Sequence, residues 1–361
     1  MLDCAIGHAH WISMTQLQSK YYWLMIQNIM RKLLIAAAFF VVLFEAGAAQ
    51  AQRKIYVGLS TLNSRVTPLW IAQERGFFAK NGLEVLLVLT RVSQPAIAAL
   101  LAGEMQMVYG GSTAALGAVS GGADLKVVAA LTNRLTYDLV ARPGVNRAEE
   151  LRGKRLGVGS IGGTVWMGAM LGLEHLGLEA SRDRISILVV GDQTNTSQAL
   201  EAGSIDAALL DGVFTHRLRQ KGFPVVAEFA GANIPFAGQG IVASGSYLMK
   251  QPAVIENFLK GLLEGIDFSL APGNRPAVLK TMTARLRLPD AASAEVGYQD
   301  LIRGVEPKPY PSLEGLRNLQ RLMRVHNPKV GSIRVEEMVD DRILRRIIEG
   351  GFLDTVRSPN R

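Results

Sequence analysis

The stretch PLWIAQERGFFAKNGLEVLLVL, residues 68–89, decides the fold class. Its first half predicts a short helix, which Thr67 caps and Pro68 opens, because proline at the first helical position gives up only an N–H that no helix bond uses. Gly76 is placed to end that helix. The run EVLLVL that follows is apolar without alternation, which is typical of a strand buried on both faces. With KIYVGLS, residues 54–60, the stretch predicts a parallel β-α-β unit.

Ahead of this unit lies a segment with the order of a Sec signal peptide. Residues 30–51 carry two basic residues, an apolar run over 33–44 and an Ala-Gln-Ala end. The apolar run is shorter than the roughly 20 residues that a membrane span needs. We therefore expect export to the periplasm with cleavage after Ala51, and we interpret residues 1–29 as an over-extended gene start. The alternative is a genuine N-terminal extension with an uncleaved anchor.

Composition excludes several classes of protein for the expected mature chain. The only cysteine, Cys4, lies in the leader, so no disulfide, thiolate nucleophile or cysteine metal site is expected. Removing the leader takes away three basic and two acidic residues, and the formal net charge falls from +8 to +7. The basic residues are scattered apart from RILRR, residues 342–346, which we interpret as a solvated helix face. We therefore expect no nucleic-acid partner.

Catalytic patterns are also missing from the sequence. The histidines left after the leader, His175, His216 and His326, are widely spaced, without a paired metal motif, and there is no G-x-S-x-G elbow. We therefore predict no catalytic residue, no metal and no cofactor.

From Lys54 to Ser246 short apolar strands alternate with helical segments, and after Ser246 only helices are expected. This order predicts an α/β fold with mostly parallel sheets flanked by helices and a helical C-terminal extension. The ten strand candidates cover residues 55–60, 84–90, 106–110, 125–131, 137–141, 155–160, 185–191, 206–210, 224–230 and 240–244.

A weak internal repeat recurs at a spacing of 100 residues. Ser60 and Ser160 end equivalent strands, AALLAGEMQ aligns with QALEAGSID, and Gly111 falls opposite Asp211. The repeat predicts two similar lobes, the second inserted in the first. The predicted parts are lobe 1 at 52–140 and 241–310, lobe 2 at 141–240, and a helical tail at 311–361. The predicted crossings between the lobes are Tyr137–Arg142 and Gln239–Ser244.

Four stretches carry a resemblance to a known family. They are PLWIAQERGFFAKNGLEVLLVL, AALLAGEMQMVYGG, ELRGKRLGVGSIGGTVWMGAMLGLEHLGL and ALEAGSIDAALL, within roughly residues 54–270. They are similar to the nitrate, sulfonate, taurine and thiamine-precursor (pyrimidine) substrate-binding proteins of ABC transporters. The resemblance implies the type II periplasmic-binding fold, with two lobes, two crossover hinge strands and a small-molecule solute held between them. It also implies a monomer that delivers a sulfonate, nitrate, carboxylate or pyrimidine to an inner-membrane ABC permease.

Loops at the carboxyl ends of the strands are the expected binding site, because ligands of open parallel sheets lie there, against helix N-termini. Five such loops, at 60–64, 91–94, 110–113, 160–164 and 192–196, are rich in hydroxyl and amide side chains and suit an anion or a small polar solute. The predicted ligand-binding residues are Ser60, Thr61, Asn63, Arg91, Gln94, Gly111, Ser112, Thr113, Ser160, Gly162, Gly163, Thr164, Trp166, Asp192, Asp211 and Gln239.

One helix end is too weak to hold a solute alone. The N-terminus after SIGGT, which Ser160 or Thr164 could cap, favours an anion by about 0.3–1 kcal/mol when exposed and about 2 kcal/mol when partly buried. Micromolar affinity needs roughly 8 kcal/mol. We therefore expect both lobes to contribute, and we expect Trp166 to face the crevice.

Other interpretations remain open at this point. Hydroxyl side chains in these loops could merely cap helices, Asp211 could do the same, Arg91 could be an exposed surface residue, and Trp166 could turn into the core. The chain could serve a signalling partner as an exported sensor. It could also be an exported enzyme, since residues 157–162 fit the dinucleotide pattern G-x-G-x-x-G, with Glu174 or Glu179 near the distance of a ribose-binding carboxylate.

Overall fold

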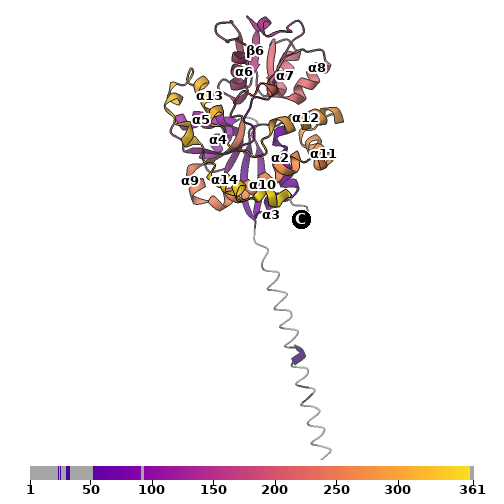
Figure 1. The fold of residues 1–361 in the computed structure, drawn as a ribbon, viewed down its shortest axis with the longest axis vertical. Helices are drawn as coiled ribbons and strands as arrows, with labels where there is room; N and C mark the ends of the chain where they lie inside the picture. The colour runs from indigo at the N-terminus through magenta and orange to yellow at the C-terminus, as the bar shows by residue number, and fades with distance from the viewer. Residues whose placement is uncertain (1–22, 24, 26–29, 33–51, 91–92, 358–361) are drawn as a thin grey trace, which may run out of the picture. The chain divides into compact units, whose positions relative to one another are not determined.

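The computed structural model describes residues 23, 25, 30–32, 52–90 and 93–357 (Figure 1). The chain divides into two units, residues 1–51 and 52–361, and both lobes belong to the second. The predicted signal peptide and its cleavage site lie outside the described residues except for residues 30–32, which are helical. Arg91 lies outside them as well.

Two five-stranded sheets carry the fold. In lobe 1 the order is β2-β1-β3-β10-β4 and in lobe 2 it is β7-β6-β8-β5-β9, with β10 and β5 antiparallel to their neighbours. The strands are β1 (Arg53–Leu59), β2 (Leu83–Leu89), β3 (Met107–Gly111), β4 (Leu125–Ala130), β5 (Asp138–Ala141), β6 (Arg155–Val158), β7 (Ser186–Val189), β8 (Ala207–Leu210), β9 (Val225–Glu228) and β10 (Gln239–Ser244). Each of the ten predicted strands is present, and the predicted α/β fold class is confirmed.

Helices flank both sheets, and after β10 the described chain forms helices and helical turns without a further strand. Figure 1 shows α6, α7 and α8 around β6 in lobe 2, and α12 and α13 on either side of the molecule next to lobe 2. The α-helices are α2 (Thr67–Glu74), α3 (Phe77–Lys80), α4 (Ser93–Leu101), α5 (Ser112–Ser120), α6 (Thr164–His175), α7 (Gln193–Glu201), α8 (Gly212–Gln220), α9 (Gly245–Lys250), α10 (Pro252–Leu270), α11 (Arg275–Leu286), α12 (Ala291–Gly304), α13 (Leu313–Met323), α14 (Arg342–Glu349) and α15 (Phe352–Arg357). The 3-10 helices are η2 (Ser64–Val66), η3 (Ala148–Leu151), η4 (Phe229–Gly231), η5 (Pro272–Asn274), η6 (Pro328–Ser332) and η7 (Val335–Met338).

The 100-residue repeat is visible in the element bounds. Helix α4 begins at Ser93 and α7 begins at Gln193, and α5 and α8 begin at Ser112 and Gly212. Strand β3 likewise corresponds to β8. The two lobes are therefore built on the same order of strand, loop and helix, and equivalent strand ends carry equivalent loops.

The chain crosses between the sheets twice. Residues 131–137 lead from β4 to β5, residues 232–238 lead back to β10, and the two segments are hydrogen-bonded to each other. Leu135 N donates to Ile234 O at 3.0 Å, and Phe236 N donates to Asn133 O at 3.0 Å. The sheet pairing assigns β5 to lobe 2 and β10 to lobe 1. The predicted crossings Tyr137–Arg142 and Gln239–Ser244 lie too late in the chain, because most of their residues form β5 and β10, which pair within one sheet each. The exact domain boundaries stay predictions.

The start of α2 differs in detail from the prediction. A 3-10 turn, η2, precedes the helix, and the Asn63 side chain caps that turn by accepting a hydrogen bond from Arg65 N at 3.1 Å. Thr67 is the first helical residue, and its hydroxyl donates to Ser64 O at 2.6 Å instead of capping α2. Gly76 ends the helix as expected, with a φ of 72° that favours glycine. The turn leaves Asn63 at the end of β1 facing lobe 2.

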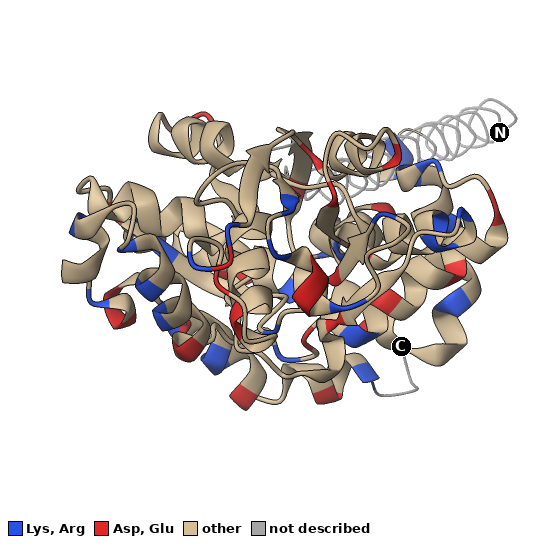
Figure 2. Cartoon of the chain, turned by 90° about the horizontal axis from the view of Figure 1, so that it is seen from above, with Lys and Arg blue, Asp and Glu red and all other residues tan. Residues whose placement is uncertain are grey.

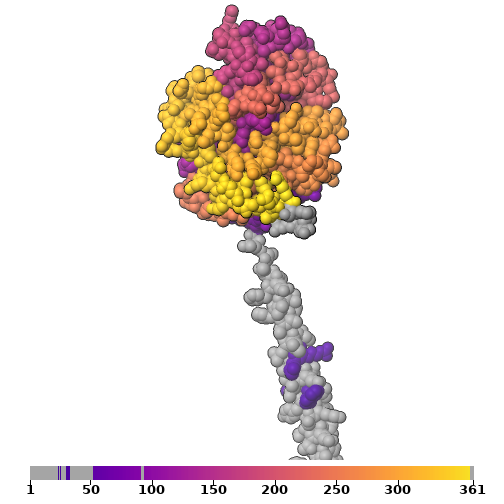
Figure 3. Space-filling view, viewed as in Figure 1, coloured from indigo at the N-terminus to yellow at the C-terminus, as the bar shows by residue number. Residues whose placement is uncertain are grey.

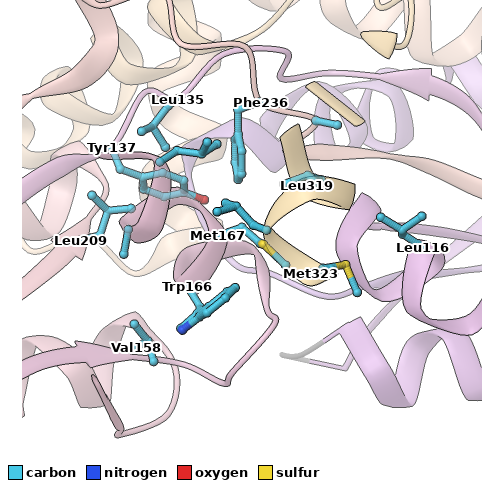
Figure 4. Packing of buried hydrophobic residues seen from close by; sticks show 14 of the residues in the cluster. Leu116, Leu135, Tyr137, Val158, Trp166, Met167, Leu209, Phe236, Leu319 and Met323 are labelled. Atoms are coloured by element: carbon cyan, nitrogen blue, oxygen red, sulfur yellow. The ribbon is translucent and has the colours of Figure 1, made fainter. Parts of the chain in front are cut away.

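Two large apolar clusters stabilise the unit. One lies in lobe 1 and includes α10 and α14. The other joins α5 of lobe 1, α6 of lobe 2 and α13 of the C-terminal tail, and Figure 4 shows Leu116, Trp166, Met167, Leu319 and Met323 gathered from these three helices. The tail therefore packs against both lobes.

The surface is mixed in charge. Figure 2 shows Lys and Arg interspersed with Asp and Glu. In the basic run of α14, Arg342 pairs with Asp340, Arg345 with Asp341, and Arg346 with Glu256. Among the described residues no helix is both long enough and apolar enough to span a bilayer.

Candidate functional site

Strand-end loops of both lobes meet at one cavity, which we call the serine pocket. Its volume is about 100 Å³. It is lined by Ser60, Thr61, Ser93, Gln94, Thr113, Tyr137, Gly159, Ser160, Gly163, Thr164, Val165, Gly191, Asp192, Gln193, Thr196 and Gln239. Figure 3 shows the pink surface of lobe 2 above the gold and orange C-terminal helices, with purple atoms of lobe 1 between them.

Hydroxyl groups on the lobe 1 side of the serine pocket are held in a short chain. Ser93 Oγ donates to Ser60 Oγ at 3.0 Å, and Gly111 N donates to Ser93 Oγ at 3.3 Å. Ser60 N in turn donates to Tyr109 O, which fixes the end of β1 beside β3. These hydrogen bonds fix the positions of the Ser60 and Ser93 hydroxyls in the absence of a solute.

The lobe 2 side presents the N-terminus of α6. Gly162 has a φ of 73°, which favours glycine, and a Cβ on Gly163 would lie 2.4 Å from Ser160 Oγ, so a larger residue there would displace that hydroxyl. Gly163, which has no side chain, is the N-cap residue, and Thr164 is the first helical residue, so neither Ser160 nor Thr164 holds the N-cap position. The first N–H groups of α6 are therefore open to a polar or anionic group in the pocket.

A second cavity, the aspartate pocket, adjoins the first and shares Thr61, Asp192 and Gln193 with it. Its volume is about 150 Å³. It is lined by Thr61, Leu62, Asn63, Ser64, Asp192, Gln193, Thr194, Asp211, Val213, Phe214, Leu286 and Leu288. Asp192 caps α7 by accepting from Thr194 N and Asn195 N.

Several buried polar atoms of these linings have no hydrogen-bond partner. They are Asn63 Nδ2, Gln239 Oε1 and Asp211 Oδ2. Each side chain is at least nine-tenths buried. An unpaired buried polar atom costs about 1–3 kcal/mol, so these three atoms favour any group that can reach and pair with them.

Charge on the cavity walls is acidic. Asp192 and Asp211 line the pockets, and no lysine or arginine does so within the described part of the chain. The polar groups that the described linings offer are therefore mainly hydroxyls, amides and helix N-termini, together with the Asp211 carboxyl.

Asp211 titrates in an unusual range. It is the N-cap residue of α8, and burial, followed by the charge of Asp300, raises its pKa to about 7. Burial also raises the pKa of Asp138 to about 6. The positive charge of Arg65 lowers the pKa of Asp211, and that of Arg303 lowers the pKa of Asp138.

Stability should therefore fall as the pH rises through this range. A raised pKa means that the folded protein retains a proton which the unfolded chain loses, so the stabilisation is full below about pH 4 and is lost as the pH reaches about 7. We expect Asp211 to contribute a fall of about 2–3 kcal/mol in the free energy of unfolding between pH 5 and pH 8, which Asp211→Asn should remove, and Asp138 a further fall of about 1 kcal/mol. Urea unfolding at both pH values measures it. An unchanged pH slope in Asp211→Asn would show that this carboxyl ionises normally.

A buried ion pair lies behind the aspartate pocket. Arg65 Nη2 donates to Asp300 Oδ1 at 2.7 Å, and Ser64 Oγ donates to Asp300 Oδ2 at 2.7 Å. The guanidinium lies 5.0 Å from the ring centroid of Tyr137 and donates to Thr136 O at 3.4 Å. The ion pair therefore connects the loop after β1 and helix α12 to the first crossing segment, residues 131–137.

Most of the predicted binding residues are brought together. Those that line the serine pocket are Ser60, Thr61, Gln94, Thr113, Ser160, Gly163, Thr164, Asp192 and Gln239. Asn63 and Asp211 line the aspartate pocket. Gly111 and Ser112 line neither, although a Cβ on Gly111 would lie 1.9 Å from Thr164 Oγ1, so the lobes touch at this point.

Trp166 does not occupy its predicted place in the crevice. Its side chain is 4% exposed, and its ring centroid lies 5.1 Å from that of His326 in an edge-on arrangement. With Gly162 it lines a different cavity, the side groove, because α13 packs against that face of α6. The side groove is lined by Gln94, Ile97, Ala98, Leu101, Thr113, Ala114, Gly117, Ala118, Ile161, Gly162, Trp166, Met323, His326 and Asn327.

Some lining residues were not predicted from the sequence. Ser93, Gln193 and Thr196 belong to the strand-end loops named above, and their place at a strand end was the available signal. Tyr137 comes from a predicted crossing, and its position between the two lobes was the signal that could have found it. Leu286 and Leu288 come from the end of α11, and no sequence signal connects them to the loops.

The dinucleotide interpretation is not supported by the surroundings of residues 157–162. Glu174 forms an ion pair with Arg321 on α13, and Glu179 accepts a hydrogen bond from Ser181, so neither carboxylate lines the pockets. Gly157 is explained by packing, because a Cβ there would lie 2.4 Å from Ile205 Cδ1. Within the described residues no group of three or more His, Cys, Asp or Glu side chains could hold a metal ion.

Comparison with known proteins places the chain by family and by fold. The family model described as NMT1/THI5 like matches residues 63–274. No curated protein matches the sequence.

Solved structures with the same fold include the alkanesulfonate-binding protein SsuA from Xanthomonas axonopodis pv. citri bound to MOPS. It is 19% identical with a TM-score of 0.64, over 80% of this chain and 98% of that one. The periplasmic nitrate-binding protein NrtA from Synechocystis PCC 6803 is 13% identical with a TM-score of 0.62, over 84% and 91%. DszB in complex with biphenyl-2-sulfinic acid, an enzyme, is 14% identical with a TM-score of 0.60, over 83% and 99%. At these identities the likeness establishes the fold.

Proposed function

The chain belongs to the NMT1/THI5-like family, and we propose that it is an exported receptor that captures a small solute between its lobes and presents it to an ABC permease. The observation that carries the proposal is the serine pocket, where hydroxyls and an uncapped helix N-terminus from two lobes face each other. Closure of two lobes around a ligand is a common binding mode. The fold neighbours named for sulfonate and nitrate binding support this class.

We propose a polar organic or anionic solute of the sulfonate, nitrate, carboxylate or pyrimidine type. The lining supports non-covalent recognition, because its described residues include no histidine, cysteine or lysine to activate a nucleophile. We further propose that Sec export removes residues 1–51 and that the protein acts as a monomer.

A thermal-shift screen of such solutes tests the proposal. At a solute concentration 100 times the dissociation constant, binding stabilises the folded protein by about 2.7 kcal/mol. Failure of every solute class to raise the melting temperature would contradict the receptor function.

Serines from both lobes should then matter for affinity. Ser60→Ala and Ser160→Ala each remove a hydroxyl worth about 0.5–1.5 kcal/mol, so each should weaken binding by about 2- to 12-fold. The double variant should not be additive, because lobe closure couples the two sites. Calorimetry with the screened solute measures this, and Ser181→Ala on the exposed surface of lobe 2 is the matched control. If either single change leaves affinity intact, that serine only shapes its loop.

A further inference from the structure

The side groove is the largest of the cavities around the lobe interface. Its volume is about 430 Å³, compared with about 100 Å³ for the serine pocket. Helices α4 and α5 form one wall, Ile161 and Trp166 of lobe 2 form another, and Met323 and His326 of the tail close its end. Its lining is mostly apolar, and a dry apolar cavity of only about 150 Å³ already accommodates benzene.

Both rims of the groove expose large apolar side chains. Leu101 on α4 of lobe 1 is 50% exposed, and Ile161 before α6 of lobe 2 is 47% exposed. An apolar occupant would cover surface on both lobes at once. It would therefore favour the closed arrangement as well as its own binding.

The side groove adjoins the serine pocket. Gln94 and Thr113 line both cavities. On the lobe 2 side, Thr164 and Val165 line the serine pocket while the next residue, Trp166, lines the groove. A molecule whose polar group lies against Ser60 and the α6 N-terminus would reach the groove by passing Gln94, whose side chain is exposed.

We propose that the solute carries an apolar tail, an alkyl chain or aromatic ring, that binds in the side groove while its polar head occupies the serine pocket. The inference rests on the proposed receptor function and narrows its solute class. Small inorganic anions such as nitrate leave the groove empty. The exposed ring of His326, whose centroid lies 5.1 Å from that of the buried Trp166, provides an aromatic surface at the end of the tail site.

Homologous series of probes test the proposal. Straight-chain alkanesulfonates, alkanoates and 1-aminoalkanes of one to eight carbons are titrated into the purified full chain by calorimetry. In at least one series the dissociation constant should fall about two- to fourfold per added methylene, as expected for burial of apolar surface.

Two variants separate the groove from the head site. Ala98 is exposed on α4 at the groove, so Ala98→Trp should fill it without disturbing the core, and Leu101→Asp places a carboxylate at its rim. Both should abolish the chain-length dependence while leaving the shortest probe's affinity unchanged. The exposed Ala253→Trp on α10 is the matched control.

The outcomes distinguish the two proposals. If short probes bind but affinity does not depend on chain length, or depends on it equally in Ala98→Trp, the tail site is overturned while the receptor function stands. The groove would then be a candidate surface for a macromolecular partner. If no series binds, the proposed solute classes are wrong. The fluorescence of 1-anilinonaphthalene-8-sulfonate then tests whether the groove binds an apolar molecule. Equal dye binding by wild type and Ala98→Trp overturns the inference, and loss in the variant supports it.

Discussion

Asp300→Ala is expected to lower the free energy of unfolding by about 3–5 kcal/mol, because it removes the carboxylate that pairs directly with the buried guanidinium of Arg65. The exposed fractions of the Arg65 and Asp300 side chains are 1% and 4%. The change also removes the acceptor of Ser64 Oγ. Urea unfolding at pH 7 measures the loss.

Two comparisons show whether the loss comes from an orphaned buried charge. The ion pair of Arg317 and Glu336 is more than half exposed on both sides, so Glu336→Ala should change stability by only about 0–1 kcal/mol. Replacing both buried partners, with Arg65→Met and Asp300→Leu together, should restore much of the stability, since apolar pairs of similar volume often substitute for buried ion pairs. A loss below 1 kcal/mol in Asp300→Ala would mean that water reaches Arg65.

Part of the site could be predicted from the sequence, and part could not. Ser60 and Ser160 were found because a repeat and the parallel strand order place them at equivalent strand ends. Asp300 on α12 binds Arg65 although more than two hundred residues separate them in the sequence, and no repeat or motif predicts this contact. Contacts made by the C-terminal helices depend on how those helices pack, which their apolar periodicity alone does not specify.

Trp166 illustrates the same limit. Its position two residues after the start of α6 was correctly placed near the lobe interface, but which side of the helix it occupies is decided by α13 and His326. The prediction that Thr67 caps α2 was wrong for a local reason, because the 3-10 turn η2 precedes the helix and Asn63 caps that turn. Strand order and loop chemistry were therefore predictable, whereas helix rotation and tail packing were not.

Gly111→Val is expected to weaken solute binding by about 5- to 150-fold while the protein stays folded. Gly111 has an ordinary φ of −70°, so its backbone does not require glycine. The requirement comes from space, because a Cβ would lie 1.9 Å from Thr164 Oγ1 of the opposite lobe. Overpacking costs about 1–3 kcal/mol, and we expect the closed arrangement to bear that cost, because opening of the lobes would move Thr164 away from Gly111. Calorimetry with the screened solute measures the affinity.

Relief of the same contact provides the decisive comparison. Thr164→Ala in the Gly111→Val background should recover part of the lost affinity, judged against Thr164→Ala alone so that the threonine's own contribution cancels. Gly273→Val is the control for the substitution itself, because nothing lies within 4 Å of a Cβ at that position. If Gly111→Val binds as tightly as the wild type, the solute is held with the lobes apart at Gly111, and the serine pocket cannot be closed by their contact there.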